Sequence, residues 1–194
     1  MTHRFADIAF TGSVKAAQDA YGSREHNDRL QAKAGPNDRL GLKEAAYIAE
    51  RDSFYLATIG DSGWPYVQHR GGPKGFLKVL DDRRIAYADF RGNLQLISVG
   101  NVSVDDRVSL ILMDYPHRKR LKILGHMHVH EAAASPDLLA QVQLDDYRGR
   151  VERVVVIEVA AFDWNCPQHI TRRYTEDEIA ALASSAGGNA APAA

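Results

Sequence analysis

The feature that most constrains this chain is a succession of short strand-forming runs separated by tight turns, which starts at residue 53. Ser53 to Ile59 and Pro65 to Arg70 flank a Gly-Asp-Ser-Gly turn, a pattern that predicts a β-hairpin. Further runs follow at residues 75–80, 85–88, 108–113, 121–129 and 151–159. Short strands with helices mostly outside them predict a mainly β protein of the α+β class. We expect an antiparallel β-barrel of six or seven strands with peripheral helices.

The segment from Leu121 to Val129 is the clearest of these strands, because its residue types alternate with period two. The apolar residues and Gly125 share one face, and polar side chains share the other, interrupted only by Leu124. The polar face carries Arg120, Lys122, His126, His128 and His130. One face of this strand is therefore predicted to lie in the core.

Three histidines at alternate positions of one strand could ligate a metal ion, because their imidazoles project from the same face. No carboxylate stands in register to complete a convincing ligand set, although Glu131 is adjacent. Solvated histidines on the outer face of the barrel are the preferred interpretation, and no metal is predicted.

The composition changes on either side of the strand-rich part. Residues 1–45 are polar and helix-forming and are interpreted as an N-terminal helical extension. Residues 46–175 form the predicted barrel domain, with short helices expected at 92–99 and 136–144. Residues 176–194 are expected to form a last helix and a disordered tail of small residues.

Charge and cysteine content exclude several classes of partner. The 24 basic and 25 acidic side chains give a net charge of −1, so no bulk attraction to nucleic acid or to an anionic membrane is expected. Cys166 is the single cysteine, so an intramolecular disulfide is impossible, and an inert thiol is favoured over a redox role. The N-terminus lacks the apolar core of a signal peptide, and no run approaches the roughly 20 apolar residues of a membrane span. A cytoplasmic protein is expected.

One stretch has the composition of an anion-binding loop. Polar side chains at a strand end are followed by glycines and a lysine, in the order Gln68, His69, Arg70, Gly71, Gly72, Pro73, Lys74. Glycines allow backbone N–H groups to approach an anion, and basic side chains supply charge, so the segment would suit a phosphate. A hairpin turn with solvated charges explains the same residues equally well. The order matches neither a Walker A loop nor the dinucleotide fingerprint.

Several segments together resemble a known family. The strands carrying FYLATIGDSGWPYVQHRGG, YADFRGN, VSLILMDYP and RLKILGHMHV resemble, in order and spacing, the pyridoxamine 5′-phosphate oxidase-like FMN-binding split barrels. The resemblance covers roughly residues 40–175. The segments RDSFYLAT, RGG, DFRGN and WNCPQHI look like a flavin-binding group within that superfamily, not like the vitamin B6 oxidase itself. The resemblance implies an FMN cofactor and a homodimer whose cofactor sites lie at the subunit interface.

The resemblance also implies which residues hold FMN. They are Gln68, His69, Arg70, Gly71, Gly72, Lys74, Ala88, Asp89, Arg91, Asn93, Gln95, Arg120, Trp164, Asn165 and Gln168. Asn93 and Gln95 stand where the family has the serine and the basic residue of its phosphate clamp. Arg91 and Lys74 are therefore expected to supply the missing charge. Arg120 matches the residue that meets the flavin ring from the neighbouring subunit.

The segment Trp164-Asn165-Cys166-Pro167-Gln168-His169-Ile170 follows the last predicted strand. Its indole could lie against a flat ring, and the amide of Asn165 or Gln168 could bond the ring edge. The alternative is a structural strand end, with Trp164 in the core. The site interpretation is preferred because the resembling proteins close their flavin cleft with this region.

The expected function is that of an FMN-binding oxidoreductase that passes a hydride or electron pair between flavin N5 and an unidentified small molecule. No catalytic residue can be assigned, and His69 and His169 are the candidates because histidine titrates near neutral pH. The alternatives are a flavin-binding sensor or carrier without turnover, or the same barrel binding haem or the deazaflavin F420. The C-terminal signature of the vitamin B6 oxidase is absent, so pyridoxamine 5′-phosphate is not assigned as substrate.

Overall fold

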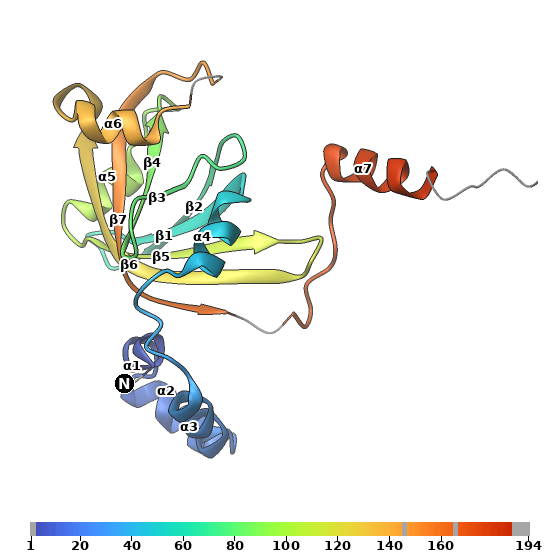
Figure 1. Ribbon diagram of the computed structural model, residues 1–194. Helices are drawn as coiled ribbons and strands as arrows, with labels where there is room; N and C mark the ends of the chain where they lie inside the picture. The colour runs from blue at the N-terminus through green and yellow to red at the C-terminus, as the bar shows by residue number, and fades with distance from the viewer. Residues whose placement is uncertain (1–2, 145–146, 165–166, 188–194) are drawn as a thin grey trace, which may run out of the picture.

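The computed structural model describes residues 3–144, 147–164 and 167–187 (Figure 1). Its centre is a single antiparallel sheet of seven strands, in the order β2-β1-β5-β6-β7-β4-β3. The strands are β1 Ser53–Ile59, β2 Pro65–Gly71, β3 Lys78–Val79, β4 Arg84–Phe90, β5 Arg107–Asp114, β6 Lys119–Glu131 and β7 Val151–Trp164. The predicted mainly β fold of the split-barrel type is confirmed. The sheet curls without closing, and its two end strands, β2 and β3, do not pair with each other.

Alternation along the strands places the core on the inner face of the curled sheet. In β6, Leu121, Ile123 and Met127 are buried, as the period of two predicts. These residues belong to a cluster that also contains Phe54 of β1 and Tyr87 of β4, whose ring centroids lie 5.4 Å apart. Each strand therefore has an inner face, directed at the core, and an outer face.

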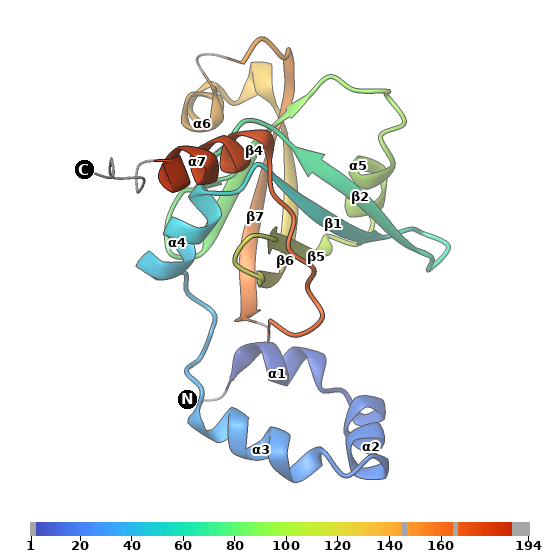
Figure 2. The same cartoon turned by 90° about the vertical axis from the view of Figure 1, so that its right-hand side faces the viewer.

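The helices lie outside this sheet. They are α1 Arg4–Ala9, α2 Gly12–Ala20, α3 Arg24–Lys33, α4 Leu42–Ala49, α5 Ile97–Val102, η1 Ala132–Ala134, α6 Pro136–Val142 and α7 Glu176–Gly187. Figures 1 and 2 show α1 to α3 at one end of the barrel, and α7 standing away from the sheet in Figure 1. No helix in the described part of the chain has the length and apolar character needed to cross a bilayer.

One helix starts later than predicted. A helix was expected over residues 92–99, whereas α5 begins at Ile97. The residues before it form a loop in which Leu94 and Leu96 have positive φ angles of 61° and 54°. A left-handed residue interrupts a right-handed helix, and residue types alone do not signal it when the residue is leucine.

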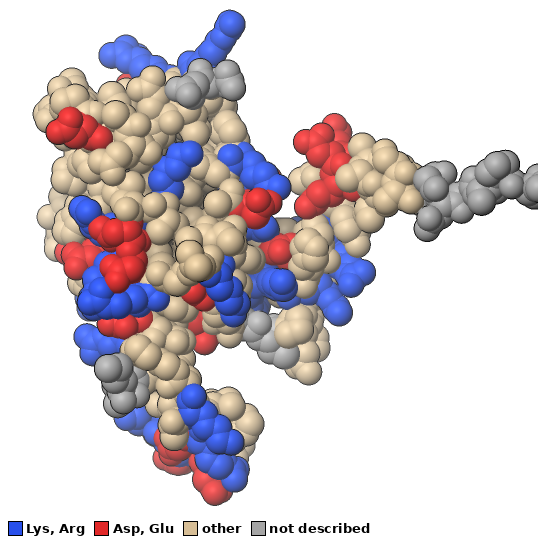
Figure 3. Space-filling model, viewed as in Figure 1, with Lys and Arg blue, Asp and Glu red and all other residues tan. Residues whose placement is uncertain are grey.

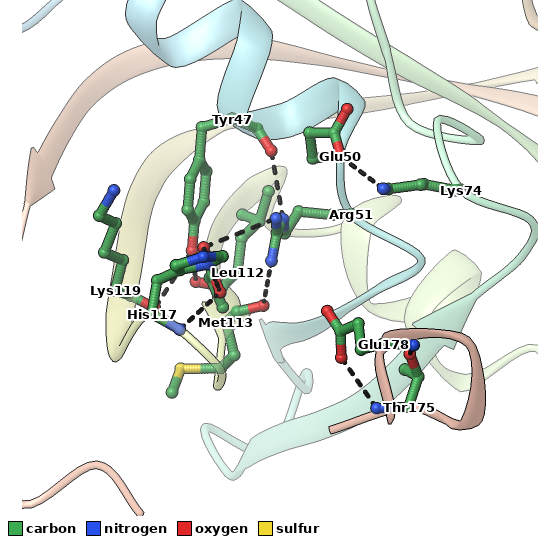
Figure 4. Close-up of polar contacts among 11 residues, drawn as sticks. Tyr47, Glu50, Arg51, Lys74, Leu112, Met113, His117, Lys119, Thr175 and Glu178 are labelled. Carbon is green, nitrogen blue, oxygen red and sulfur yellow. Dashed lines mark hydrogen bonds and ion pairs between the residues drawn. The ribbon is translucent and has the colours of Figure 1, made fainter. Parts of the chain in front are cut away.

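The helix α4 is fixed to the sheet by its last turn (Figure 4). The Tyr47 hydroxyl lies 3.1 Å from the carbonyl oxygen of Leu112 in β5, to which it donates. Arg51 Nη1 donates to the carbonyl oxygen of Met113 at 3.1 Å. Burial raises the pKa of the Tyr47 phenol, so the hydroxyl remains a donor at neutral pH. These bonds set the start of β1, which begins two residues after Arg51.

A β-bulge in β7 explains why β6 has a glycine at position 125. The pairing shifts from Leu124 opposite Ala161 to Gly125 opposite Val159, so one residue of β7 is unpaired. A Cβ atom at Gly125 would lie 2.5 Å from the backbone oxygen of Glu158. The backbone of a central strand cannot move away cheaply, so only glycine fits at this position.

We expect Gly125→Ala to lower the free energy of unfolding by about 2 kcal/mol, because the added methyl group overpacks a backbone contact. Urea denaturation followed by circular dichroism measures the change. Gly100→Ala is the matched control, since a Cβ there meets nothing within 4 Å and replaces a helical glycine. Equal stabilities of the two variants would contradict the account of the bulge.

Candidate functional site

The open seam of the sheet contains a pocket of about 210 Å³, which we call the seam pocket. Its walls are the inner face of β2, the end of β4, the start of β7, the loop 91–96 and the first residues of α5. Five of the residues that the resemblance implied line it: Gln68, Arg70, Asp89, Asn93 and Gln95. The structure thus brings together residues from two segments that are separate in the sequence, 68–70 and 89–95.

A buried carboxylate shared by two arginines forms one side of the seam pocket. Asp89 Oδ1 accepts from Arg70 Nη1 at 3.1 Å, and Asp89 Oδ2 accepts from Arg153 Nε at 2.8 Å. The three side chains are only 7%, 18% and 12% exposed in the order Asp89, Arg70, Arg153. Arg70 and Asp89 come from strands that do not pair, so their ion pair crosses the seam.

Two buried donors in this region have no hydrogen-bond acceptor among the described residues. They are Arg70 Nε and the hydroxyl of Tyr87, which precedes Asp89 by two residues on the same face of β4. Burial raises the pKa of the Tyr87 phenol, so this group stays neutral. A buried donor without an acceptor costs about 1–3 kcal/mol. Of these two residues, Arg70 lines the pocket and Tyr87 does not, so a ligand oxygen could offset that cost only at Arg70.

The loop 91–96 and α5 cover the pocket from the other side. Ser98 Oγ donates to Gln68 Oε1 at 3.2 Å, and Asn101 Nδ2 donates to Thr58 Oγ1 at 2.9 Å, so α5 is tied to β2 and β1. Within the loop, Asn93 Oδ1 accepts from the backbone N–H of Gln95 at 3.1 Å. The two left-handed leucines, described above, are held between these polar contacts, each at a cost of about 1 kcal/mol or more.

Alternation along β2 separates the predicted residues of that strand. His69, Gly71 and Gly72 do not line the seam pocket, because His69 and Gly71 belong to the outer face of β2. They line a wide, open hollow with Tyr147 instead. The His69 ring packs edge-on against Tyr55, with centroids 5.6 Å apart.

Lys74 and Arg91, which were expected to supply the positive charge missing from the phosphate clamp, do not line the seam pocket. Lys74 pairs with Glu50, which follows α4 (Figure 4), and this ion pair lowers the pKa of the Glu50 carboxyl. Arg91 Nε lies 3.6 Å from Glu152 Oε1, and Arg91 is absent from the pocket wall. Ala88 is buried in a second apolar cluster, against α6.

Arg120 and Trp164 lie at the opposite end of the β6–β7 ribbon from Arg153, since Leu121 pairs with Trp164 and Glu131 pairs with Arg153. Trp164 Nε1 donates to Glu44 Oε1 at 2.7 Å, and its ring packs edge-on against Tyr47. Within one chain, Trp164 therefore packs against the core at the end of β7, as the structural alternative to a cofactor contact predicts. Arg120 Nε is buried and has no acceptor among the described residues.

The rest of the C-terminal segment is only partly described. Asn165 and Cys166 lie outside the described residues. Gln168 and His169 are exposed in a turn, and His169 has a φ angle of 61°. The structure therefore brings neither of them to the seam pocket.

The histidines of β6 do not gather into a ligand set. His126 Nδ1 lies 2.8 Å from Asp106 Oδ1, and no cluster of three metal-ligating side chains occurs among the described residues. Figure 3 shows Lys and Arg interspersed with Asp and Glu on the face in view, without a patch of one sign.

Sequence reasoning missed Arg153, although a signal was present. Arg153 shares its parity along β7 with the core residues Val155, Ile157 and Val159. An arginine on the inner face of a strand needs a buried partner of opposite charge. Asp89 lies two residues after the core residue Tyr87, so it too is on the inner face of its strand, β4. Two opposite charges on inner faces would have suggested the pair.

Several solved structures are similar to this chain. A solved structure described as a candidate pyridoxamine 5′-phosphate oxidase from Lactobacillus delbrueckii superposes with a TM-score of 0.50 at 20% identity, covering 65% of this chain and 94% of that one. A structure of HupZ from Group A Streptococcus has a TM-score of 0.49 at 14% identity, and the match covers 70% of this chain and 99% of HupZ. A structure of an FMN-binding protein from Syntrophomonas wolfei has a TM-score of 0.47 at 12% identity, and the match covers 80% of this chain and 98% of that one. None of the curated proteins compared with the chain matches it.

The curled sheet with its open seam defines a split-barrel protein. The sequence model of the family described as pyridoxamine 5′-phosphate oxidase matches residues 43–165, which is more than half of the chain. The chain therefore belongs to the pyridoxamine 5′-phosphate oxidase family.

We expect Asp89→Asn to lower the free energy of unfolding by about 3 kcal/mol, because it leaves two largely buried guanidinium groups without their shared counter-charge. Guanidinium chloride denaturation of the ligand-free protein measures this. Asp28→Asn is the control, since Asp28 pairs with Arg24 on the exposed surface of α3 and its loss should change stability by less than about 1 kcal/mol. A loss at Asp89 no larger than that at Asp28 would refute the structural role of the shared carboxylate.

Proposed function

We propose that this protein is a homodimeric, FMN-dependent oxidoreductase that holds the phosphorylated end of the cofactor in the seam pocket. The observation that carries the proposal is Arg70, a largely buried arginine at the pocket wall whose buried Nε–H has no acceptor among the described residues. A charged donor left unsatisfied in a family of small-molecule-binding barrels favours an anionic ligand at this position.

The residues present fit such a group. Gln68 and Asn93 carry amide groups at the pocket wall, and amide N–H groups can donate to phosphate or ribityl oxygens. The volume of about 210 Å³ is smaller than the roughly 300–1,000 Å³ of sites that enclose a whole ligand. The pocket therefore suits the phosphate and part of the ribityl chain, and the ring system would extend past the exposed rim formed by Leu94 and Leu96.

When bound, FMN would supply two-electron redox chemistry, and the protein would supply placement and electrostatics. Arg70 would hold the anionic end and Gln68, positioned by Ser98, would orient the chain next to it. His69 and His169 remain the proposed proton donors or acceptors, since each is exposed to solvent and an imidazole nitrogen can donate or accept a hydrogen bond. The substrate is proposed only as a small molecule.

The dimer is proposed because the outer face of β1 and β2 exposes apolar side chains that a second copy could cover. Tyr55 and Ile59 of β1, Val67 of β2 and Trp64 of the turn between them are all exposed. A second copy is the occupant that would also bring its Arg120, which lies on the outer face of β6, to a shared site. Contiguous exposed apolar surface on a sheet favours such an interface.

We expect the protein to bind FMN as a dimer and Arg70→Gln to weaken that binding by at least about tenfold, because the pocket loses a charge-assisted donor. Isothermal titration calorimetry of the apoprotein and light scattering after gel filtration measure the two properties. Arg39→Gln, which removes an exposed ion pair with Asp82, serves as the control. A monomer that gives no heat with FMN would overturn the proposal.

Turnover is decided by a second measurement on the same preparation. Anaerobic reduction by NADH or NADPH, followed by a panel of acceptors, should show substrate-dependent reoxidation of the bound flavin. Indifference to every donor and acceptor would leave a flavin-binding sensor or carrier. A Soret band, or binding of F420 in preference to FMN, would replace the proposed cofactor.

A further inference from the structure

The loop 91–96 leaves the seam pocket short of positive charge. Its two residues at the pocket wall with hydrogen-bonding side chains, Asn93 and Gln95, are neutral amides. Lys74 and Arg91 do not line the pocket, since each pairs with a glutamate elsewhere. Among the described residues of the wall, the positive charges are those of Arg70 and Arg153 alone.

We propose that Arg153, reaching the seam pocket from β7, is the second cation that binds the anionic end of the ligand and makes the protein select a phosphorylated flavin over its unphosphorylated form. The inference rests on the proposed function, because it concerns the same pocket. The inference adds Arg153 to the phosphate site, although none of the residues expected in the phosphate clamp belongs to its strand, β7.

The geometry leaves both guanidinium groups able to bind a ligand. Asp89 engages Nη1 of Arg70 and Nε of Arg153, and Glu152 accepts from Arg153 Nη2 at 3.4 Å. Nη2 of Arg70 and Nη1 of Arg153 make no hydrogen bond among the described residues. Asp89 therefore acts as a positioning residue that orients two planar donors without saturating them.

The charges favour an anion in this pocket. Arg70, Arg153 and Asp89 at the pocket wall together carry a net charge of +1, and Glu152, which also contacts Arg153, is offset by its ion pair with Arg91. A phosphate monoester carries about −1.5 to −2 at pH 7. Burial weakens solvent screening, so each guanidinium contributes more here than at the surface. A ligand that ends in a hydroxyl group would gain neither the charge nor the paired donors.

The test compares FMN and riboflavin as ligands of the full-length apoprotein by calorimetry. We expect Arg153→Gln to weaken FMN binding by about tenfold to a hundredfold and to change riboflavin binding by less than about threefold. Arg153→Lys keeps the positive charge but loses the planar, paired N–H donors of the guanidinium. Its preference for FMN over riboflavin should therefore be weaker than that of the wild type and stronger than that of Arg153→Gln. Arg84→Gln removes an exposed arginine from the other end of β4 and should leave both affinities unchanged.

The ratio of the two affinities separates a ligand contact from a structural effect, because damage to the fold would weaken both flavins alike. If the wild type binds neither flavin, the proposed function fails and this inference fails with it. If the wild type prefers FMN and Arg153→Gln keeps the same preference, the inference alone is refuted. Should Arg153→Gln fail to fold, an Arg153→Lys variant with the full wild-type preference and affinity would refute it in the same way.

Discussion

The interaction on which this structure depends is the sharing of the Asp89 carboxylate by Arg70 and Arg153 across the open seam. Strands β2 and β4 make no backbone hydrogen bonds to each other, so side chains must hold the two parts of the curled sheet together at this point. Removal of one member would leave a charge buried without compensation, which is far more costly than the net gain from the intact pair. The split barrel thus keeps its shape at the seam through charged side chains that also line a pocket.

Side-chain contacts also hold the loop 91–96, which forms part of the pocket wall. The helix α5 is tied to β1 and β2 through Asn101 and Ser98, so the loop before it has both ends fixed. The left-handed leucines within the loop persist because their surroundings determine the backbone. Strained backbone of this kind clusters where proteins clamp ligands, which agrees with the place of these leucines at the pocket wall.

Much of the fold could be predicted from the sequence, because alternation in segments such as Leu121 to Val129 reports directly which face is buried. The seam pocket was predicted in part: Arg70 and Asp89 were expected at one site, but His69 was placed with them although neighbouring residues of a strand face opposite sides. The start of α5 could not be predicted, since a left-handed leucine is imposed by tertiary contacts and not by residue type. Arg153 was overlooked because its strand was interpreted only as a hydrophobic element.

The distribution of the remaining residues agrees with the proposed dimer, in which a single chain would hold only part of the site. Arg70 and Asp89 face the seam pocket, whereas His69 and Arg120 lie on the outer face of the same sheet. A sheet separates these two groups, so one small ligand can contact both within a protomer only around the edge strand β2. A second copy packed on the outer face would instead present its own Arg120 beyond that edge, next to the exposed rim of the pocket. In the proposed dimer, the open seam, the exposed apolar side chains of β1 and β2 and the small pocket volume would all follow from one design, in which one chain holds the anionic end of the cofactor and two chains hold its ring.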